Sequence, residues 1–149
     1  MEKIIETEKI FLRKLNFEDF YKLSEILKDI EVMYAWEHSF SDGEIKEWIE
    51  NNIRKYEEDK TGYLAVIDKK TKDFVGQAGI HYSIVNNKKI LEIGYIIMKK
   101  FWNKGYAYEA AGALIKYVFD STEEKIIYAL IRPENYRSSK LAKKLGFIP

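Results

Sequence analysis

The sequence predicts a mixed α/β domain with an antiparallel meander of strands at its centre. Runs typical of strands and segments with apolar residues at helical spacing follow one another in the order β-α-α-β-β-β-α-β-α. An Asn-Asn pair at 86–87 separates two strand-like runs, and Asn tolerates the positive φ that a tight hairpin turn needs. The length of 149 residues suits one domain with a single core, so residues 1–149 are expected to form one unit.

The N-terminal third is predicted to hold one strand and one helix. Residues 4–14 have the apolar alternation of a strand. Asn16 is a suitable N-cap for a helix over 17–28, where apolar side chains recur at helical spacing. The segment 32–40 is rich in aromatic residues and is expected to be irregular.

A second helix and the strands of the meander come next. Ser41 and Glu44 match a capping box, and the helix that they open is expected to reach Glu58. Gly62 interrupts the helical pattern. Strands are then expected at 63–67, 74–84 and 90–98.

The C-terminal third is predicted to contain two helices with a strand between them. A helix is expected over 106–119 and a strand over 125–132. The last helix is expected to end near Leu145, because Gly146 suits the position that follows a helix.

Composition excludes several classes of protein. With 46% hydrophobic and 33% charged residues the chain is not disordered, and no apolar run approaches the ~20 residues of a membrane helix. The N-terminus carries acids and lacks the apolar stretch of a signal peptide, which predicts a cytoplasmic protein. A net charge of +1 gives no basic excess for nucleic acid. With no cysteine and two histidines, the chain is expected to bind no metal and to use no thiol nucleophile.

The stretch from Glu92 to Ala111 carries the strongest functional signal. The apolar run 93–98 leads through a basic loop with one glycine, 99–105, directly into a helical pattern. This arrangement directs free backbone N–H groups at an anion, and the partial positive charge of the helix N-terminus adds to the attraction. We therefore expect a phosphate-bearing ligand at this loop.

The hairpin before the loop has one apolar and one polar face. A two-residue turn at 86–87 places His81 opposite Glu92 and Gly79 opposite Gly94. The glycines leave room for a close approach to the backbone. The His–Glu pair has two interpretations, an acid–base device or an exposed charge pair that contributes about 0.2–1 kcal/mol. The apolar face is expected to lie under the C-terminal helices.

Six short motifs are distributed along the chain: Leu12 to Leu15 with Glu18-Asp19, Gly94-Tyr95, Trp102 to Ala107, Glu109-Ala110, Asn135 with Ser138, and Leu145-Gly146-Phe147. Together these motifs resemble the GNAT acetyltransferases, and among them the RimJ/RimL-type N-acetyltransferases. The resemblance covers nearly all of the chain and implies a GNAT-like, mainly antiparallel central sheet flanked by helices.

The resemblance implies an N-acetyltransferase that moves an acetyl group directly from acetyl-CoA to a primary amine. The amine would belong to a protein N-terminus or to a small molecule, because an α-amine (pKa ~8) loses its proton at a cost of roughly 1 kcal/mol near neutrality, against about 4 for a lysine-like amine. Two departures from other GNAT proteins leave a second reading open. Leu130 and Ala142 stand where some members have a Glu and a Tyr acid, which would suit a weak or inactive acyl-CoA-binding module.

The resemblance also implies which residues hold acetyl-CoA. Backbone N–H groups of the loop would bind the pyrophosphate, and the strand before it would pair with the pantetheine arm. Asn135 would bind the pantetheine or cap the last helix, and both roles are compatible. Ser138 would donate to the departing thiolate, unless it is only a helix-surface residue. The implied cofactor residues are Tyr95, Ile96, Ile97, Asn103, Lys104, Gly105, Tyr106, Ala107, Tyr108, Asn135 and Ser138.

The candidate catalytic residues are Glu92, Ser138 and Ile97. Glu92 is the leading candidate for the base, acting directly or through water, and an N–H near Ile97 would stabilise the oxyanion, a donor that can contribute ~3 kcal/mol. The acceptor amine would lie between the N-terminal helices and the polar face of the hairpin. Its expected contacts are Tyr34, Trp36, His81 and Glu92, although Tyr34 and Trp36 also suit a core.

The end of the sequence differs from the family pattern. Family members usually continue past the Gly-Phe motif with two more strands, whereas this sequence ends at Pro149. A sheet without those strands would have a bare edge, which favours association. Either the protein is shortened, or a second subunit of a homodimer covers the edge.

Overall fold

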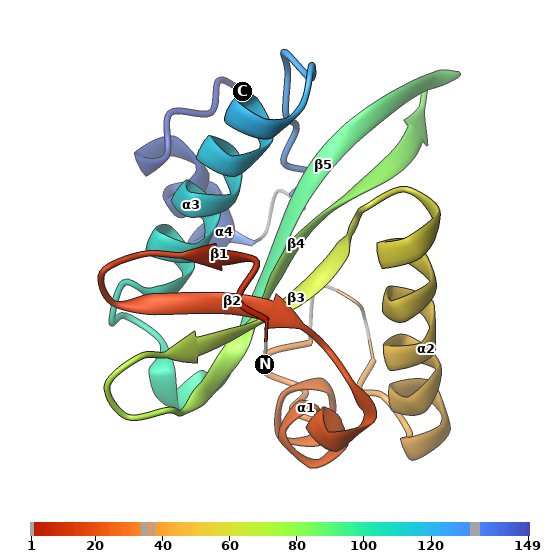
Figure 1. Ribbon diagram of the computed structural model, residues 1–149, viewed down its shortest axis with the longest axis vertical. Helices are drawn as coiled ribbons and strands as arrows, with labels where there is room; N and C mark the ends of the chain where they lie inside the picture. The colour runs from red at the N-terminus through yellow and green to blue at the C-terminus, as the bar shows by residue number, and fades with distance from the viewer. Residues whose placement is uncertain (1, 34–35, 37, 132–134) are drawn as a thin grey trace.

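The computed structural model describes residues 2–33, 36, 38–131 and 135–149 (Figure 1). Within these residues, five strands form one antiparallel sheet in which every strand pairs with its sequence neighbours. The strands are β1 (Ile5–Glu6), β2 (Ile10–Lys14), β3 (Gly62–Asp68), β4 (Phe74–Val85) and β5 (Lys88–Ile97). The helices are α1 (Phe20–Leu27), α2 (Asp42–Glu58), α3 (Tyr106–Ser121) and α4 (Tyr136–Lys144), with short 3₁₀ turns η1 (Phe17–Asp19) and η3 (Lys99–Phe101).

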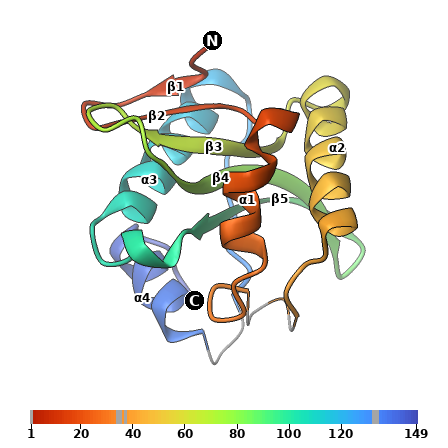
Figure 2. The same cartoon turned by 90° about the horizontal axis from the view of Figure 1, so that it is seen from below.

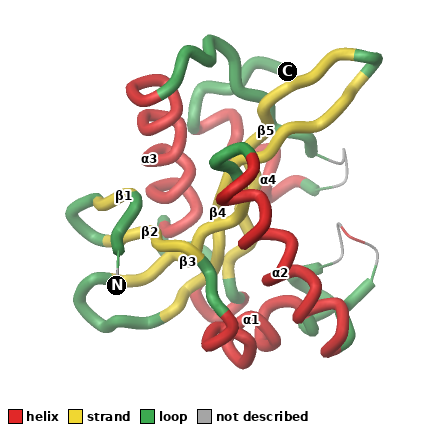
Figure 3. The backbone as a smooth tube through the Cα atoms, turned by 45° about the vertical axis from the view of Figure 1, so that its right-hand side comes forward, coloured by secondary structure: helices red, strands yellow, loops and turns green. Residues whose placement is uncertain are grey.

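Helices cover both faces of the sheet, so β2, β3 and β4 bury consecutive residues, which point to opposite faces. Figure 2 shows α3 and α4 on one face and α1 and α2 on the other. Ile80 and Ile93 belong to the core under α3, as expected of the apolar face of the hairpin. Ile49 of α2 and Ile96 of β5 belong to the opposite core. The far end of the β4–β5 hairpin projects beyond the helices (Figure 3).

The β4–β5 hairpin has the predicted register. His81 lies opposite Glu92 and Gly79 opposite Gly94. Both turn residues have positive φ, 51° at Asn86 and 63° at Asn87. A type I′ turn requires this conformation at both central positions, and its twist matches that of the strands. The turn therefore fixes which side chains share the polar face.

Three predicted elements differ from the structure in extent. The strand expected over 4–14 is split into β1 and β2, because Thr7 N–H donates to the Ile10 carbonyl at 2.9 Å and turns the chain. The helix expected from residue 17 begins as a 3₁₀ turn, although Asn16 does cap it. The strand expected over 125–132 is reduced to one parallel bridge at Tyr128, as far as its described residues extend.

A buried ion pair connects β2 to the start of α1. The guanidinium of Arg13 donates to both carboxylate oxygens of Asp19, at 2.9 and 2.8 Å. Asp19 also accepts the backbone N–H of Asn16 at 2.9 Å, which closes the cap of η1. A charge of this kind is tolerated inside a protein only while its partner is present.

We expect Asp19→Ala to lower the free energy of unfolding by about 3–5 kcal/mol, because it leaves the Arg13 charge buried without its partner. Urea unfolding measures the loss. The control is Glu18→Ala, which removes an exposed carboxylate one residue earlier and should stay within about 0.5 kcal/mol of the parent. Equal effects of the two substitutions would contradict a structural role for the pair.

Candidate active site

The loop between β5 and α3 presents a helix N-terminus whose first N–H groups are open. Gly105 is the N-cap residue with φ 84°, and no side chain in the described structure caps this end. A Cβ at this φ would be strained, which explains the glycine. Glu109 N–H is the first to bond within the helix, at 3.0 Å to the Gly105 carbonyl. The N–H groups of residues 106–108 are therefore free to bind an anion.

The outer edge of β5 is paired at one point only within the described residues. Tyr128 accepts the N–H of Ile93 and donates to the carbonyl of Leu91, both at 2.9 Å. Because the backbone groups of a strand alternate in direction, Tyr95 and Ile97 direct their N–H groups to the same edge. Beyond Tyr128, β5 and the segment 129–131 lie on two sides of a cleft that both of them line.

The cleft has a volume of about 950 Å³ and brings together most of the predicted site residues. Lys104 is not among them, because its carbonyl faces Lys9 Nζ at 3.4 Å. Tyr34 lies outside the described residues, so the structure says nothing about it. The predicted residues that line the cleft are Trp36, His81, Glu92, Tyr95, Ile96, Ile97, Asn103, Gly105, Tyr106, Ala107, Tyr108, Asn135 and Ser138.

The N-terminus of α4 forms the wall opposite β5. The side-chain oxygen of Asn135 accepts the N–H of Ser138 at 3.2 Å, which confirms its capping role. The Tyr95 hydroxyl donates to the Ser138 carbonyl at 3.4 Å, and burial raises the pKa of this tyrosine. These contacts position α4 against the strand edge.

Trp102 anchors the loop at the point where it leaves the sheet. Its indole N–H donates to the Ile97 carbonyl at 2.8 Å, so this carbonyl has a partner inside the protein. The guanidinium of Arg137 lies over the indole ring, 3.7 Å from its centre. Trp102 thus connects β5, the loop and α4, consistent with loop packing.

His81 Nε2 contacts Glu92 Oε1 on the polar face of the hairpin. The side chains are only 22% and 13% exposed, so the interpretation as an exposed charge pair is wrong. The second carboxylate oxygen, Glu92 Oε2, is buried and has no hydrogen-bond partner among the described residues. A buried acceptor of this kind is costly unless a ligand or water satisfies it.

The Tyr63 ring occupies the space above the two glycines, where the sequence indicated room for a ligand. Tyr63 pairs with Gly79, which pairs with Gly94, so the three residues form one row across the sheet. A Cβ at Gly94 would lie 2.3 Å from the Tyr63 hydroxyl. Sequence reasoning missed Tyr63, and the facing glycines were the signal that a ring from the next strand could cross there.

Asp68 is a second residue that sequence reasoning missed. It accepts the Tyr106 hydroxyl at 2.6 Å, and this hydrogen bond raises the pKa of Tyr106 to about 12 and lowers that of Asp68. The other carboxylate oxygen accepts N–H groups of Lys70 and Thr71, at 2.8 and 2.9 Å. The β3–β4 turn therefore holds the first residue of α3 beside the open N–H groups.

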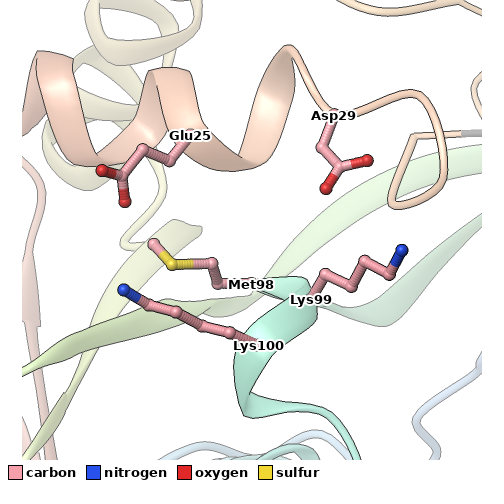
Figure 4. A pocket seen from close by; sticks show the side chains of 5 residues that line it. All are labelled: Glu25, Asp29, Met98, Lys99 and Lys100. Atoms are coloured by element: carbon pink, nitrogen blue, oxygen red, sulfur yellow. The ribbon is translucent and has the colours of Figure 1, made fainter.

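A smaller hollow of about 520 Å³ lies outside this cleft, between α1 and η3. Figure 4 shows Glu25 of α1 and Asp29 on one side of it, with Lys99 and Lys100 facing them across Met98. None of the predicted site residues lines this hollow. It is open and mixed in charge, and the cleft at β5 remains the candidate active site.

Comparison with known proteins identifies the family. The model of the acetyltransferase (GNAT) domain matches residues 9–148. The chain belongs to this family. Acetyl transfer from acetyl-CoA is what this membership implies, and the fold and cleft described above agree with it.

Three similar proteins show how far the likeness extends. YkkB of Bacillus subtilis, an uncharacterized protein, is 33% identical over 141 residues, which are 94% of this chain and 82% of YkkB. A GNAT-family acetyltransferase from Bacillus anthracis has a crystal structure with a TM-score of 0.82 and 29% identity, covering 95% of this chain and 81% of that one. RimL, the ribosomal L7/L12 alpha-N-protein acetyltransferase, has a structure in complex with coenzyme A. The comparison gives a TM-score of 0.81 and covers 98% of this chain and 84% of RimL. At 17% sequence identity, this likeness shows a shared fold alone.

Two further features of the structure bear on function. Across the described ranges no helix is both long and apolar enough to cross a membrane. Nor do three or more His, Asp or Glu side chains gather in this part of the chain as a metal site would require.

We expect Asp68→Asn to destabilise the protein by about 1–3 kcal/mol at pH 7, because it weakens hydrogen bonds to a charged acceptor. Since the pKa of Asp68 is lowered in the folded protein, the contribution of the carboxylate is complete above the unfolded pKa of ~3.9. It is lost as the pH falls through the lower, folded pKa. The difference from the parent should therefore shrink below pH 4.

Urea unfolding at pH 7, 5 and 3 measures this difference. Asp73→Asn is the control, because this exposed aspartate lies in the same turn. A difference between Asp68→Asn and the parent that persists unchanged to pH 3 would contradict an ionised Asp68 as its source.

Proposed function

We propose that the chain is an acetyl-CoA-dependent N-acetyltransferase whose acceptor is a primary amine of a peptide N-terminus or a small molecule. One observation carries the proposal. Glu92, whose second carboxylate oxygen is buried without a partner in the described structure, lines the same cleft as the open N–H edge of β5 and the open helix N-terminus. An acid–base group, an oxyanion donor and an anion site are the parts that direct acyl transfer requires.

The residues present suit acetyl-CoA, which when bound supplies the acetyl group as an activated thioester. The N–H groups of residues 106–108 would bind its diphosphate. Arg137, Lys140 and Lys144 of α4 line the same part of the cleft and add positive charge. The N–H groups of Tyr95 and Ile97 would pair with the amide-rich arm along the strand edge, because Tyr128 pairs with this edge only at Leu91 and Ile93 within the described structure.

The chemical step is assigned to three groups. Ile97 N–H polarises the carbonyl of the acetyl group and stabilises the oxyanion. Glu92 takes the proton from the acceptor amine, directly or through water, while His81 holds the other carboxylate oxygen. The Ser138 hydroxyl, at the wall opposite β5, donates to the departing thiolate.

Two named proteins support an amine acceptor without identifying it. The [ribosomal protein uS5]-alanine N-acetyltransferase of Escherichia coli is 31% identical over 85 residues, 57% of this chain and 44% of that protein. RimL acts on a protein N-terminus by its name. An α-amine also demands less of the base than a lysine side chain, by about 3 kcal/mol near neutrality.

We expect coenzyme A to raise the melting temperature and acetyl-CoA to release free thiol in the presence of an acceptor. The panel of acceptors comprises tripeptides with a free N-terminal Gly, Ala or Ser, spermidine and glucosamine. Binding to the folded state alone produces the thermal shift, about 2.7 kcal/mol at 100 times Kd. Stabilisation without turnover would identify a binding module instead, and the absence of any stabilisation would contradict the proposal.

We expect Glu92→Gln to lower kcat by about 10²–10⁴-fold, because the amide cannot accept the amine proton. The thermal shift with coenzyme A should persist, since Glu92 does not contact the anion site. Glu124→Gln serves as the control, because this carboxylate bonds to Tyr82 outside the cleft. A kcat and a pH profile that stay unchanged in Glu92→Gln would remove Glu92 as the base.

A further inference from the structure

The two facing glycines place the Tyr63 hydroxyl close to β5. The backbone N–H of Tyr63 is held by Asn52 Oδ1 at 2.7 Å. A Cβ at Gly79 would lie 2.6 Å from the Tyr63 Cα, and a Cβ at Gly94 would lie 2.3 Å from its hydroxyl. The ring therefore crosses from β3 to β5 over a path that no other residue pair would leave open.

Neighbouring rings fix the position of Tyr63. The Trp48 ring lies 5.1 Å away at an interplanar angle of 30°. The His81 ring lies 6.1 Å away on the other side, at 36°. Since Trp48 in turn donates its indole N–H to Gln77 at 2.9 Å, the aromatic row is held from α2 as well as from the sheet.

The hydroxyl of Tyr63 differs from other buried tyrosine hydroxyls in this protein. It reaches the cleft and makes no hydrogen bond within the described part of the chain. Burial, and next the charge of Glu92, raise the pKa of Tyr63, so its hydroxyl stays neutral. The tyrosine hydroxyls that do have partners in the described structure belong to Tyr56, Tyr82, Tyr95, Tyr106 and Tyr128.

We propose that the Tyr63 hydroxyl and Glu92 Oε2 together bind the acceptor amine, as two contacts for one unsubstituted primary ammonium group. This inference rests on the proposed function and adds a specificity-determining residue to it. Glu92 Oε2 is buried without a partner in the described structure, and no hydrogen bond of the Tyr63 hydroxyl occurs there. Tyr63 and Glu92 both line the cleft, and the Tyr63 hydroxyl lies against Gly94, two residues from Glu92 in β5. A neutral hydroxyl and a carboxylate can each accept one N–H.

The two contacts favour a particular chemical class of acceptor. A primary ammonium has three N–H groups, so it can donate one to each oxygen and release the third proton to water, which frees the lone pair for attack on the thioester carbonyl. After attack the nitrogen loses one more proton, and Glu92 takes it. An N-methylated amine would have to give up one of the contacts or place its methyl group against them. Val32 and Trp36 line the same cleft, which suits an acceptor that carries an apolar group.

The test compares Tyr63→Phe with the parent enzyme, on the panel amine that has the highest kcat/KM. Phenylalanine keeps the ring stacking and removes only the hydroxyl. We expect the KM for this amine to rise about tenfold, as for the loss of one hydrogen bond to a charged group. The KM for acetyl-CoA and the thermal shift with coenzyme A should not change.

Two controls separate binding from structure. Tyr82→Phe removes a hydroxyl that bonds to Glu124 outside the cleft, and should leave both KM values unchanged. The N-methylated form of the same amine should be about tenfold poorer than the amine itself with the parent enzyme, and this preference should weaken in Tyr63→Phe.

Each outcome decides between the two proposals. An active parent enzyme with an unchanged acceptor KM in Tyr63→Phe would overturn the role of Tyr63 and leave the proposed function standing. Equal rises in both KM values would also overturn it, because they indicate a general structural effect. A parent enzyme that acetylates no amine of the panel would overturn the proposed function and this inference with it.

Discussion

The cleft exists because β5 is paired along one edge by β4 and, within the described residues, at a single point along the other. The two hydrogen bonds to Tyr128 fix the segment that follows α3 against β5. Past that point the segment moves away, and the N–H groups of Tyr95 and Ile97 remain open toward the cleft. A full strand over 125–131 would have accepted hydrogen bonds from those N–H groups. Because the pairing is limited to Tyr128 in the described residues, the rest of the β5 edge is available to a ligand.

The loop between β5 and α3 is held in place by contacts from several parts of the chain, and this fixes the helix N-terminus at the end of the open β5 edge. Trp102 holds the loop to the last carbonyl of β5, and Asp68 holds Tyr106 at the start of α3. Thr7 adds a contact from the β1–β2 turn, donating to Glu109 at 2.6 Å. Three parts of the chain that are distant in sequence thus position one helix N-terminus, which lets its N–H groups act as a preorganised anion site.

On the polar face of the hairpin, two glycines provide space for a side chain from a neighbouring strand because they have no side chains of their own. Without side chains at Gly79 and Gly94, the Tyr63 ring extends across the sheet, and its hydroxyl reaches Gly94 on β5. The resulting arrangement is asymmetric in charge. Glu92 of β5 lines one side of the cleft, and Arg137, Lys140 and Lys144 of α4 also line it. An anionic donor and a cationic acceptor would each meet complementary charge.

By itself the sequence determined the features that depend on neighbouring residues. The Asn-Asn turn set the register that places His81 opposite Glu92, and the glycine-containing loop identified the helix N-terminus. The tertiary structure alone decided that the Tyr63 ring fills the space above the glycines, that Asp68 holds Tyr106, and that the described part of the strand expected at 125–132 pairs only at Tyr128. These contacts join segments far apart in the chain, and they form only when the sheet brings its strands side by side. Local periodicity carries no information about which side chains will then meet.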